Sequence, residues 1–251
     1  MDIKELLLGE SARLSRVRRY SSMPVNRGET VAEHSFYVAY YSLIIAEDLL
    51  YQINGIASLE EATARGESFV VTEDFCELDW RKVLGSALLH DITESMTGDI
   101  LRQVKHDNSD ILVAFGRLES KIVNFIEEKI KVKFSPLFYA AKDESLEGRI
   151  VAIGDAFSVV SYTIEEYLTG NVYLLRVLGE IRRDHIVRLK DSIETTMKLR
   201  DGYPAEAIRI ILRKYLEELD TLIGEYLDKE PNREELIRYV TRGEKQGEET
   251  N

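Results

Sequence analysis

Residues 88–94 read Leu-Leu-His-Asp-Ile-Thr-Glu, and this segment decides both the fold and the site that we predict for the chain. His90 and Asp91 stand side by side at the end of an apolar segment with helical spacing. Two adjacent ligands hold a metal ion only when other ligands reach it from elsewhere in the chain. The sequence offers His34 and Asp155 for this purpose, each within a helical pattern of its own. These residues therefore predict a helical frame around one metal site.

Histidine nitrogens and carboxylate oxygens together suit one divalent transition metal such as Mn, Co, Fe, Ni or Zn. Two histidines and two aspartates leave room for a water molecule or a substrate oxygen, which a catalytic site needs. Each residue alone is a weak signal, because a histidine on a helix is more often structural and Asp155 could equally lie on a helix surface. The flanks of Asp155 are small or apolar, however, and bound cations remove the cost of burying a carboxylate.

The composition is that of an ordinary soluble globular protein, with 251 residues, 44% of them apolar and 31% charged. The net charge of -12 argues against nucleic-acid or membrane partners, which need clustered basic residues, but it leaves room for a small phosphate ligand. Cys76 is the only cysteine and has no neighbouring base, so we expect a passive thiol in a reducing, cytoplasmic compartment. We expect neither a signal peptide nor a membrane-spanning segment.

The helical periodicity of apolar residues and the presence of only 4 prolines predict an all-α fold. Thr30 and Glu33 match a capping box, in which each side chain bonds the backbone N–H of the other residue, and they open a helix that ends near Tyr51. Asp79 is expected to cap the helix that leads to His90. The other helices are expected over residues 2–19, 109–130, 145–168, 171–200, 204–228 and 232–242.

Between these helices, Gly170 is expected as a C-cap and Pro204 as a first-turn proline. Residues 52–78 are the least regular part, where 68–72 form either a short strand or an insertion loop. The aromatic residues that follow His34 at helical spacing are expected to pack in the core rather than to stack on a base; they are Phe36, Tyr37, Tyr40 and Tyr41.

No repeat, linker or sharp change of composition divides the chain, so the sequence indicates one helical domain. We expect this domain over residues 1–200, with residues 201–242 forming a helical extension packed on it. Residues 243–251 are polar, and we expect them to be disordered.

Four groups of residues, in this order and context, resemble the HD-domain superfamily: Glu33-His34-Ser35, Leu89-His90-Asp91 with Glu94, Thr97-Gly98-Asp99, and Gly154-Asp155-Ala156. The similarity runs from about Leu14 to about Asn171 and is greatest to the HD-type 5'-deoxynucleotidases. It implies a single HD-domain helical bundle, usually a homodimer or higher homo-oligomer. It also implies one divalent metal and the hydrolysis of deoxynucleoside 5'-monophosphates to deoxynucleosides and phosphate.

The resemblance assigns the metal ligands to His34, His90, Asp91 and Asp155, and it assigns further roles around them. Glu94 matches a glutamate that assists catalysis. Asp99 matches an aspartate that contacts the sugar and helps to place the attacking water. The phosphate-binding residues of the family correspond here to Arg19, whose guanidinium suits a two-pronged grip on phosphate, and to Lys105. Tyr20 falls where the family has a tryptophan near the sugar.

Two segments depart from the family pattern, namely Tyr20 in place of tryptophan and Leu101-Arg102-Gln103 in place of a proline-containing segment. Other interpretations stay open at this stage. Glu94 shares a face with His90 only if the helix continues, and otherwise it is a helix-end residue. Asp99 could simply form a turn. His106 and His185 are interpreted as surface residues.

The overall function also has alternatives. Within the same enzyme class, the chain could be an HD-type hydrolase of a nucleoside triphosphate or of a nucleotide second messenger. From a different class, it could be a non-catalytic module that binds nucleotides.

Overall fold

The computed structural model describes residues 1–65, 76–100 and 109–228, with their side chains except those of 56–65. Within these ranges every regular element is a helix, and β-pairing is limited to two isolated bridges, Arg18 with Thr30 and Ser145 with Lys198. The all-α prediction is confirmed.

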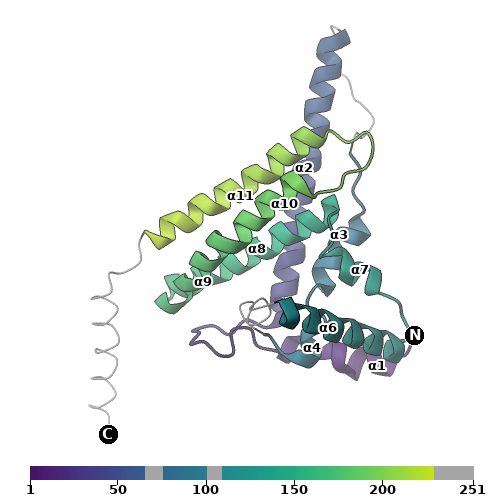
Figure 1. The fold of residues 1–251 in the computed structure, drawn as a ribbon, viewed down its shortest axis with the longest axis vertical. Helices are drawn as coiled ribbons and strands as arrows, with labels where there is room; N and C mark the ends of the chain where they lie inside the picture. The colour runs from purple at the N-terminus through teal and green to yellow at the C-terminus, as the bar shows by residue number, and fades with distance from the viewer. Residues whose placement is uncertain (66–75, 101–108, 229–251) are drawn as a thin grey trace.

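The helices follow one another along the chain as shown in Figure 1. They are α1 (Ile3–Leu8), the 3-10 helix η1 (Glu10–Arg16), α2 (Val31–Arg65), α3 (Trp80–Leu89), α4 (Glu94–Thr97), α6 (Ser109–Ile130), α7 (Ser135–Ala140), α8 (Leu146–Leu168), the 3-10 helix η2 (Val172–Leu174), α9 (Leu175–Glu180), the π-helical turn η3 (Ile181–Ile186), α10 (Val187–Thr195) and α11 (Ala205–Leu227). Helices α8, α10 and α11 lie beside one another and run obliquely to α2, while α1, α4 and α6 gather near the end of α2 that carries His34.

The largest apolar core lies where α2, α8 and α11 meet. Ile45 and Leu49 of α2 pack there with Ile150 and Ile153 of α8 and Leu212 of α11, and each is at most 4% exposed. Burial of one such side chain stabilises the fold by about 1.5–3 kcal/mol. This core therefore fixes α2 against α8, the two helices that carry His34 and Asp155.

Helices α2 and α8 approach each other closely at Gly154. A Cβ atom added at this position would lie 2.3 Å from Oγ of Ser42 and 3.0 Å from the carbonyl oxygen of Val38. The carbonyl belongs to the backbone of α2 and cannot move aside. Glycine is therefore the residue that permits this crossing, directly before Asp155.

A second apolar core supports the turn that follows α3. Ile92 packs there with Ile122 and Ile126 of α6 and with Phe138 of α7, and Phe138 is fully buried. Because Ile92 lies two residues after His90, this core holds the predicted ligand segment against the rest of the fold.

Several local signals of the sequence are confirmed. Thr30 and Glu33 form the reciprocal bonds of a capping box, with Glu33 N–H donating to Oγ1 of Thr30 at 3.2 Å and Thr30 N–H donating to Oε2 of Glu33 at 2.7 Å. Asp79 caps α3 by accepting a hydrogen bond from the backbone of Lys82. Gly170 has φ of +94° just after the end of α8, which is the left-handed conformation expected of a terminating glycine.

Other boundaries were wrong. The helix expected over 2–19 ends at Leu8 and continues as a 3-10 helix, and α2 extends to Arg65 rather than to Tyr51. The helix expected over 171–200 is divided into η2, α9, η3 and α10. Pro204 precedes α11 as its N-cap instead of lying in the first turn. Apolar periodicity does not resolve such changes of winding, because 3-10 and π segments of one or two turns are too short to establish a period of their own.

The core assignment of the aromatic residues on α2 was also wrong. Phe36 is 61% exposed, Tyr40 is 49% exposed, Tyr37 is exposed as well, and Tyr41 is only partly buried. Tyr41 alone contacts an aromatic residue of another helix, Phe157 of α8. Helical spacing placed these rings on neighbouring positions, but it could not say which side of a long helix would be covered.

Some predictions fall outside the described residues. These are the helix over 232–242, the disordered tail over 243–251 and the strand or loop over 68–72. The division of the chain at residue 200 stays a prediction. No helix within the described ranges combines the length and the low polarity that crossing a bilayer requires.

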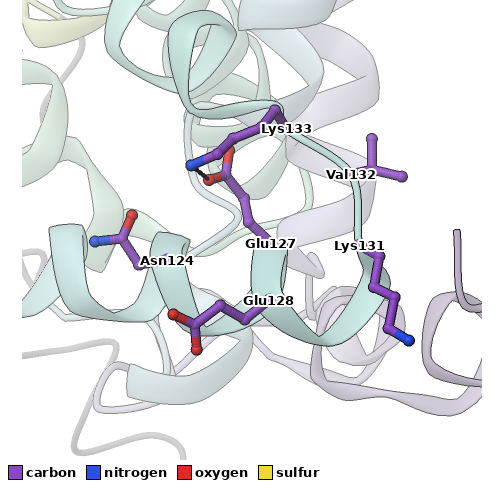
Figure 2. A pocket seen from close by; sticks show the side chains of 6 residues that line it. All are labelled: Asn124, Glu127, Glu128, Lys131, Val132 and Lys133. Atoms are coloured by element: carbon purple, nitrogen blue, oxygen red, sulfur yellow. Dashed lines mark hydrogen bonds and ion pairs between the residues drawn. The ribbon is translucent and has the colours of Figure 1, made fainter.

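The N-terminus of α7 is capped by a side chain from α6. The carboxylate of Glu127 accepts hydrogen bonds from the backbone N–H groups of Phe134 at 2.7 Å and Ser135 at 2.6 Å, and from Nζ of Lys133 at 2.8 Å. Burial opposes the charge of Glu127, but these hydrogen bonds outweigh it and lower the pKa of Glu127 to about 2. Figure 2 shows this carboxylate beside Lys133 in a surface pocket, whose lining residues are Asn124, Glu127, Glu128, Lys131, Val132 and Lys133.

We predict that Glu127→Gln lowers the free energy of unfolding by about 2 kcal/mol at pH 7, since it removes a charged cap. The folded-state pKa lies below the ordinary value of 4.5, so this contribution is complete above pH 4.5 and disappears as the pH falls toward 2. Urea unfolding of both proteins between pH 7 and pH 3 measures the difference. Glu128→Gln, an exposed neighbour, is the matched control, and an equal loss of stability in both variants would contradict the prediction.

Candidate metal centre

The four predicted ligands come from three separate parts of the chain and meet at one place. His34 lies in the first turn of α2, where its N–H bonds the carbonyl of Thr30 at 3.0 Å. His90 is the C-cap of α3, and Asp91 follows it in a tight turn. Asp155 lies on α8, next to the close crossing at Gly154.

The ligand atoms of these residues converge. The Nε2 atoms of His34 and His90 face each other at 3.3 Å. Oδ1 of Asp155 lies 3.1 Å from Nε2 of His34, and Oδ2 of Asp91 lies 3.0 Å from Nε2 of His90 and 3.7 Å from Nε2 of His34. The ligand atoms of His34, His90 and Asp155 all lie within 4.8 Å of one another, and such a set of nitrogen and oxygen donors suits a divalent transition ion.

The opposite nitrogen of each imidazole is bound by the protein. Nδ1 of His90 lies 2.7 Å from the carbonyl oxygen of Ala87, which can only accept, so Nδ1 carries a proton and Nε2 is the nitrogen that can bind a ligand once it loses its own proton. Nδ1 of His34 lies 2.9 Å from Oγ of Ser158, a hydroxyl that can accept in the same way. Such contacts orient a histidine toward a metal and select the binding tautomer.

The two histidines have opposite pKa shifts. Burial and the charge of Arg19 lower the pKa of His34 to about 4. Burial also opposes a charge on His90, but the carboxylate of Asp91 outweighs it and raises the pKa of His90 to about 9. Burial disfavours the charged form of Asp155 too, yet the hydrogen bond and charge of His34 hold the pKa of Asp155 well below its usual range. The carboxylate of Asp155 therefore stays negative and attracts a cation.

Arg19 lies beside this cluster and is almost completely buried. Burial alone would lower the pKa of Arg19, but electrostatic interactions with Tyr20, Glu29 and Asp155 outweigh it and hold this pKa above its usual range. Its Nη1 atom donates to Oε2 of Glu29 at 2.8 Å. The structure thus brings the predicted phosphate-binding arginine next to the predicted metal ligands.

Tyr20 and Asp99 are joined through the backbone. Tyr20 has the left-handed φ of 54°, and its N–H donates to Oδ2 of Asp99 at 2.8 Å. Its ring stacks on Tyr162 of α8 with 5.4 Å between ring centres and 6° between ring planes. Because Tyr20 is only 7% exposed, its ring offers little surface to a substrate. Asp99 is partly exposed and follows Gly98, whose φ of 72° forms the predicted turn.

The backbone runs from His90 to Glu94 by a different path from the expected one. Helix α3 ends at Leu89, and the next residues form tighter turns in which Ile92 N–H bonds the carbonyl of Leu89 and Glu94 N–H bonds that of Asp91. The condition that the helix continues past His90 is therefore not met. Glu94 is nevertheless buried, at 4% exposure, at the start of α4.

Lys105 and His106 lie outside the described residues, as does the segment Leu101-Arg102-Gln103. His185 is only partly buried, but its Nε2 atom is covered. Burial raises the pKa of Asp155, and His185 acts with His34 and His90 to lower it. The interpretation of His185 as a plain surface residue was therefore wrong.

Three residues that contact the site were not singled out from the sequence, namely Ser158, Glu29 and Tyr162. The position of Ser158 held a signal, because it lies three residues after Asp155 and hence on the same face of a helix. Glu29 and Tyr162 act through contacts between distant segments, for which the sequence contains no local pattern.

Known proteins resemble this chain over most of its length. A model of the family described as "5'-deoxynucleotidase YfbR-like" matches residues 58–194, more than half of the chain. A 5'-deoxynucleotidase from Erwinia tasmaniensis is 23% identical over 192 residues, which cover 75% of this chain and 86% of that protein.

Solved structures share the fold. A conserved hypothetical protein from Pyrococcus furiosus has a TM-score of 0.55 at 22% identity, with 87% of this chain and 98% of that chain covered. An HD-domain phosphohydrolase from Listeria innocua has a TM-score of 0.50 at 22% identity, with 90% of this chain and 100% of that chain covered.

The helical fold, with its histidines and aspartates converging from three segments, is that of an HD-domain protein. Within this class, the match over residues 58–194 shows that the chain belongs to the YfbR-like family of 5'-deoxynucleotidases. The resemblance seen in the sequence is confirmed. The matched range contains His90, Asp91 and Asp155, and it begins after His34 and Arg19.

We predict that Ser158→Ala weakens the binding of Mn²⁺ or Zn²⁺ about 10- to 100-fold, because the imidazole of His34 loses the contact that orients it. Isothermal titration of metal-stripped protein measures the affinity. Ser161→Ala, one turn further along α8, is the matched control and should bind both metals as the unaltered protein does. Equal affinities for the two variants would show that Ser158 does not support the site.

Proposed function

We propose that the chain is a divalent-metal-dependent 5'-nucleotidase that converts deoxynucleoside 5'-monophosphates to deoxynucleosides and phosphate. Membership of the YfbR-like family supports hydrolysis of nucleotides. The observation that carries the metal dependence is the convergence of His34, His90 and Asp155, with the two Nε2 atoms 3.3 Å apart. Oδ2 of Asp91 lies 3.0 Å from Nε2 of His90 and belongs to the same proposed site. The Nδ1 atoms of both imidazoles are bound by the protein, and their Nε2 atoms face each other. This arrangement suits a cation between the two Nε2 atoms better than a hydrogen bond between them.

The roles of the chain's own residues follow from where they lie. A divalent ion held by the four ligands would make a water molecule more acidic and offset the charge of the phosphate. Arg19 extends a second positive group toward the same place and binds the phosphate oxygens. With one cation on each side, the phosphate group is fixed in position and its negative charge is neutralised.

The two further carboxylates act on protons and water. Glu94 is buried beside Asp91 and accepts the proton of the attacking water or delivers one to the nucleoside oxygen. Asp99 uses Oδ2 to bind the backbone of Tyr20 and directs its other oxygen to the sugar and the attacking water. The water attacks phosphorus in line, the bond from phosphorus to the nucleoside oxygen breaks, and the deoxynucleoside leaves with a hydroxyl group.

The proposal includes a homodimer or higher homo-oligomer, which the family resemblance supports. It also includes a cytoplasmic location, which the single, buried and unpaired Cys76 supports. Lys105 belongs to it as a second group near the phosphate, on the strength of the resemblance.

A panel of turnover assays tests the reaction. Metal-stripped protein receives Mn²⁺, Co²⁺, Mg²⁺, Ni²⁺ or Zn²⁺ in turn, with deoxy- and ribonucleoside mono- and triphosphates, and the products are identified. We expect inorganic phosphate from deoxynucleoside monophosphates with at least one transition metal. Pyrophosphate or triphosphate as the product would identify a different HD hydrolase, and nucleotide binding without turnover would identify a binding module.

In the same assay, we predict that Asp91→Asn lowers kcat more than about 100-fold, since a neutral amide no longer supplies the carboxylate that the donor set needs. Asp110→Asn, at the exposed start of α6, is the matched control and should keep full activity. Metal content measured by mass spectrometry shows whether the ion is lost. Full activity of Asp91→Asn in metal-replete buffer would contradict the mechanism.

We further predict that Arg19→Ala mainly raises KM, by about 10- to 100-fold, because it removes charge-assisted hydrogen bonds to the phosphate. Arg18→Ala provides a control in the adjacent position, where the guanidinium is bound to the carbonyl of Gly28 instead. Steady-state kinetics on the preferred monophosphate compares the two. A larger effect at Arg18 than at Arg19 would exclude this phosphate-binding role.

A further inference from the structure

A short antiparallel pairing precedes α2 and connects two segments of the chain. Arg18 and Thr30 form an isolated antiparallel bridge. On either side of it, Arg19 N–H donates to the carbonyl of Glu29 at 2.9 Å and Val31 N–H donates to the carbonyl of Val17 at 3.0 Å. Residues 17–19 are thereby paired with 29–31, and the second segment leads directly into the helix that carries His34.

This register decides which side chains face each other. Residues that lie opposite in an antiparallel pair extend their side chains to the same side, and successive residues alternate between the two sides. Arg19 therefore faces Glu29, and the two form an ion pair of 2.8 Å with 11% and 6% of their side chains exposed. Arg18 turns the other way and remains exposed at the surface.

The ion pair lies at the edge of the candidate metal centre. The charges of Asp155 and Asp91 act on Arg19, and the charge of Arg19 acts on His34. Within the described part of the chain, Nη1 makes the one hydrogen bond of the guanidinium, to Glu29. A guanidinium has five N–H donors in a flat fork, so most of them stay available for an anion.

We propose that Glu29 is the positioning residue for Arg19, and that it holds the guanidinium at the angle from which its remaining donors meet the substrate phosphate. The proposal rests on the proposed function, in which Arg19 binds that phosphate. An arginine side chain loses much rotational freedom when it binds a ligand, and a partner that fixes it beforehand removes this cost from binding. Glu29 also supplies the negative partner that a buried cation requires before substrate arrives.

The loop between the two paired segments is held in place by contacts that do not involve the side chain of Glu29. Glu166 of α8 is buried, and its carboxylate accepts hydrogen bonds from the backbone of Asn26 at 2.7 Å and Arg27 at 2.6 Å. The hydroxyl of Tyr162, also on α8, donates to the carbonyl of Arg27 at 2.6 Å. A change of the Glu29 side chain therefore leaves the path of the loop intact and alters the placement of Arg19.

The test is Glu29→Gln, which keeps the shape of the side chain and removes its charge. Two measurements on metal-loaded protein are made, namely KM for deoxyadenosine 5'-monophosphate and Kd for inorganic phosphate by titration calorimetry. We expect both constants to rise about tenfold, with kcat changed less than about threefold and metal affinity unchanged, because the effect lies in the placement of a binding group. Constants that stay the same or fall would overturn the proposal.

A double-mutant cycle separates positioning from general stability. If Glu29 acts through Arg19, Glu29→Gln should have almost no further effect on phosphate Kd in the Arg19→Ala background. A structural role would instead give additive losses, which would count against the proposal. Glu165→Gln breaks the exposed ion pair with Arg27 in the same loop, and as the matched control it should leave phosphate binding unaltered.

The two measurements also separate this proposal from the function on which it rests. Phosphate binding that weakens in Glu29→Gln, in a protein that hydrolyses no monophosphate, would support the positioning role and contradict the proposed reaction. Normal hydrolysis with unchanged phosphate binding in Glu29→Gln would support the proposed reaction and contradict the positioning role. An unaltered protein that binds no phosphate would overturn the positioning role.

Discussion

The close crossing of α2 and α8 is the constraint on which the rest of the structure depends. It is possible because Gly154 carries no side chain where the backbone of Val38 lies against it. The crossing places His34 at the start of α2 within 3.1 Å of Asp155, one residue beyond the glycine. A wider crossing would separate these two groups, and the turn with His90 and Asp91 would then face an incomplete donor set.

The electrostatics of the cluster follow from this packing. Burial and the charge of Arg19 lower the pKa of His34 to about 4, whereas the carboxylate of Asp91 outweighs burial at His90 and raises the pKa of His90 to about 9. The positive charge therefore stays with His90, next to Asp91. A cation bound among the same groups would replace this proton and pair with both carboxylates. The four side chains therefore suit a metal ion better than they suit burial without one.

The parts of the structure that sequence could predict are those fixed by local chemistry. The capping box of Thr30 and Glu33 and the cap at Asp79 depend on residues three positions apart, and both were found as expected. The flanks of Asp155 were equally informative. They are small or apolar, and a carboxylate among such residues is costly to bury unless it binds a cation. The turns η1 and η3, the exposed face of α2 and the contact of Ser158 with His34 depend instead on how distant segments pack. Periodicity contains no information about that packing.

The pairing of residues 17–19 with 29–31 links the segment of Arg19 to the helix that carries His34. Glu29 connects to Arg19 through side chain and backbone alike, and the next residue, Thr30, caps the helix of His34. Tyr20 stacks on Tyr162, which lies on the same helix as Asp155. A stacked tyrosine buried in this way serves to support the loop rather than to contact a base. The tyrosine at the position of the family's tryptophan therefore stacks on α8, and the guanidinium carbon of Arg19 lies 5.1 Å from the centre of its ring.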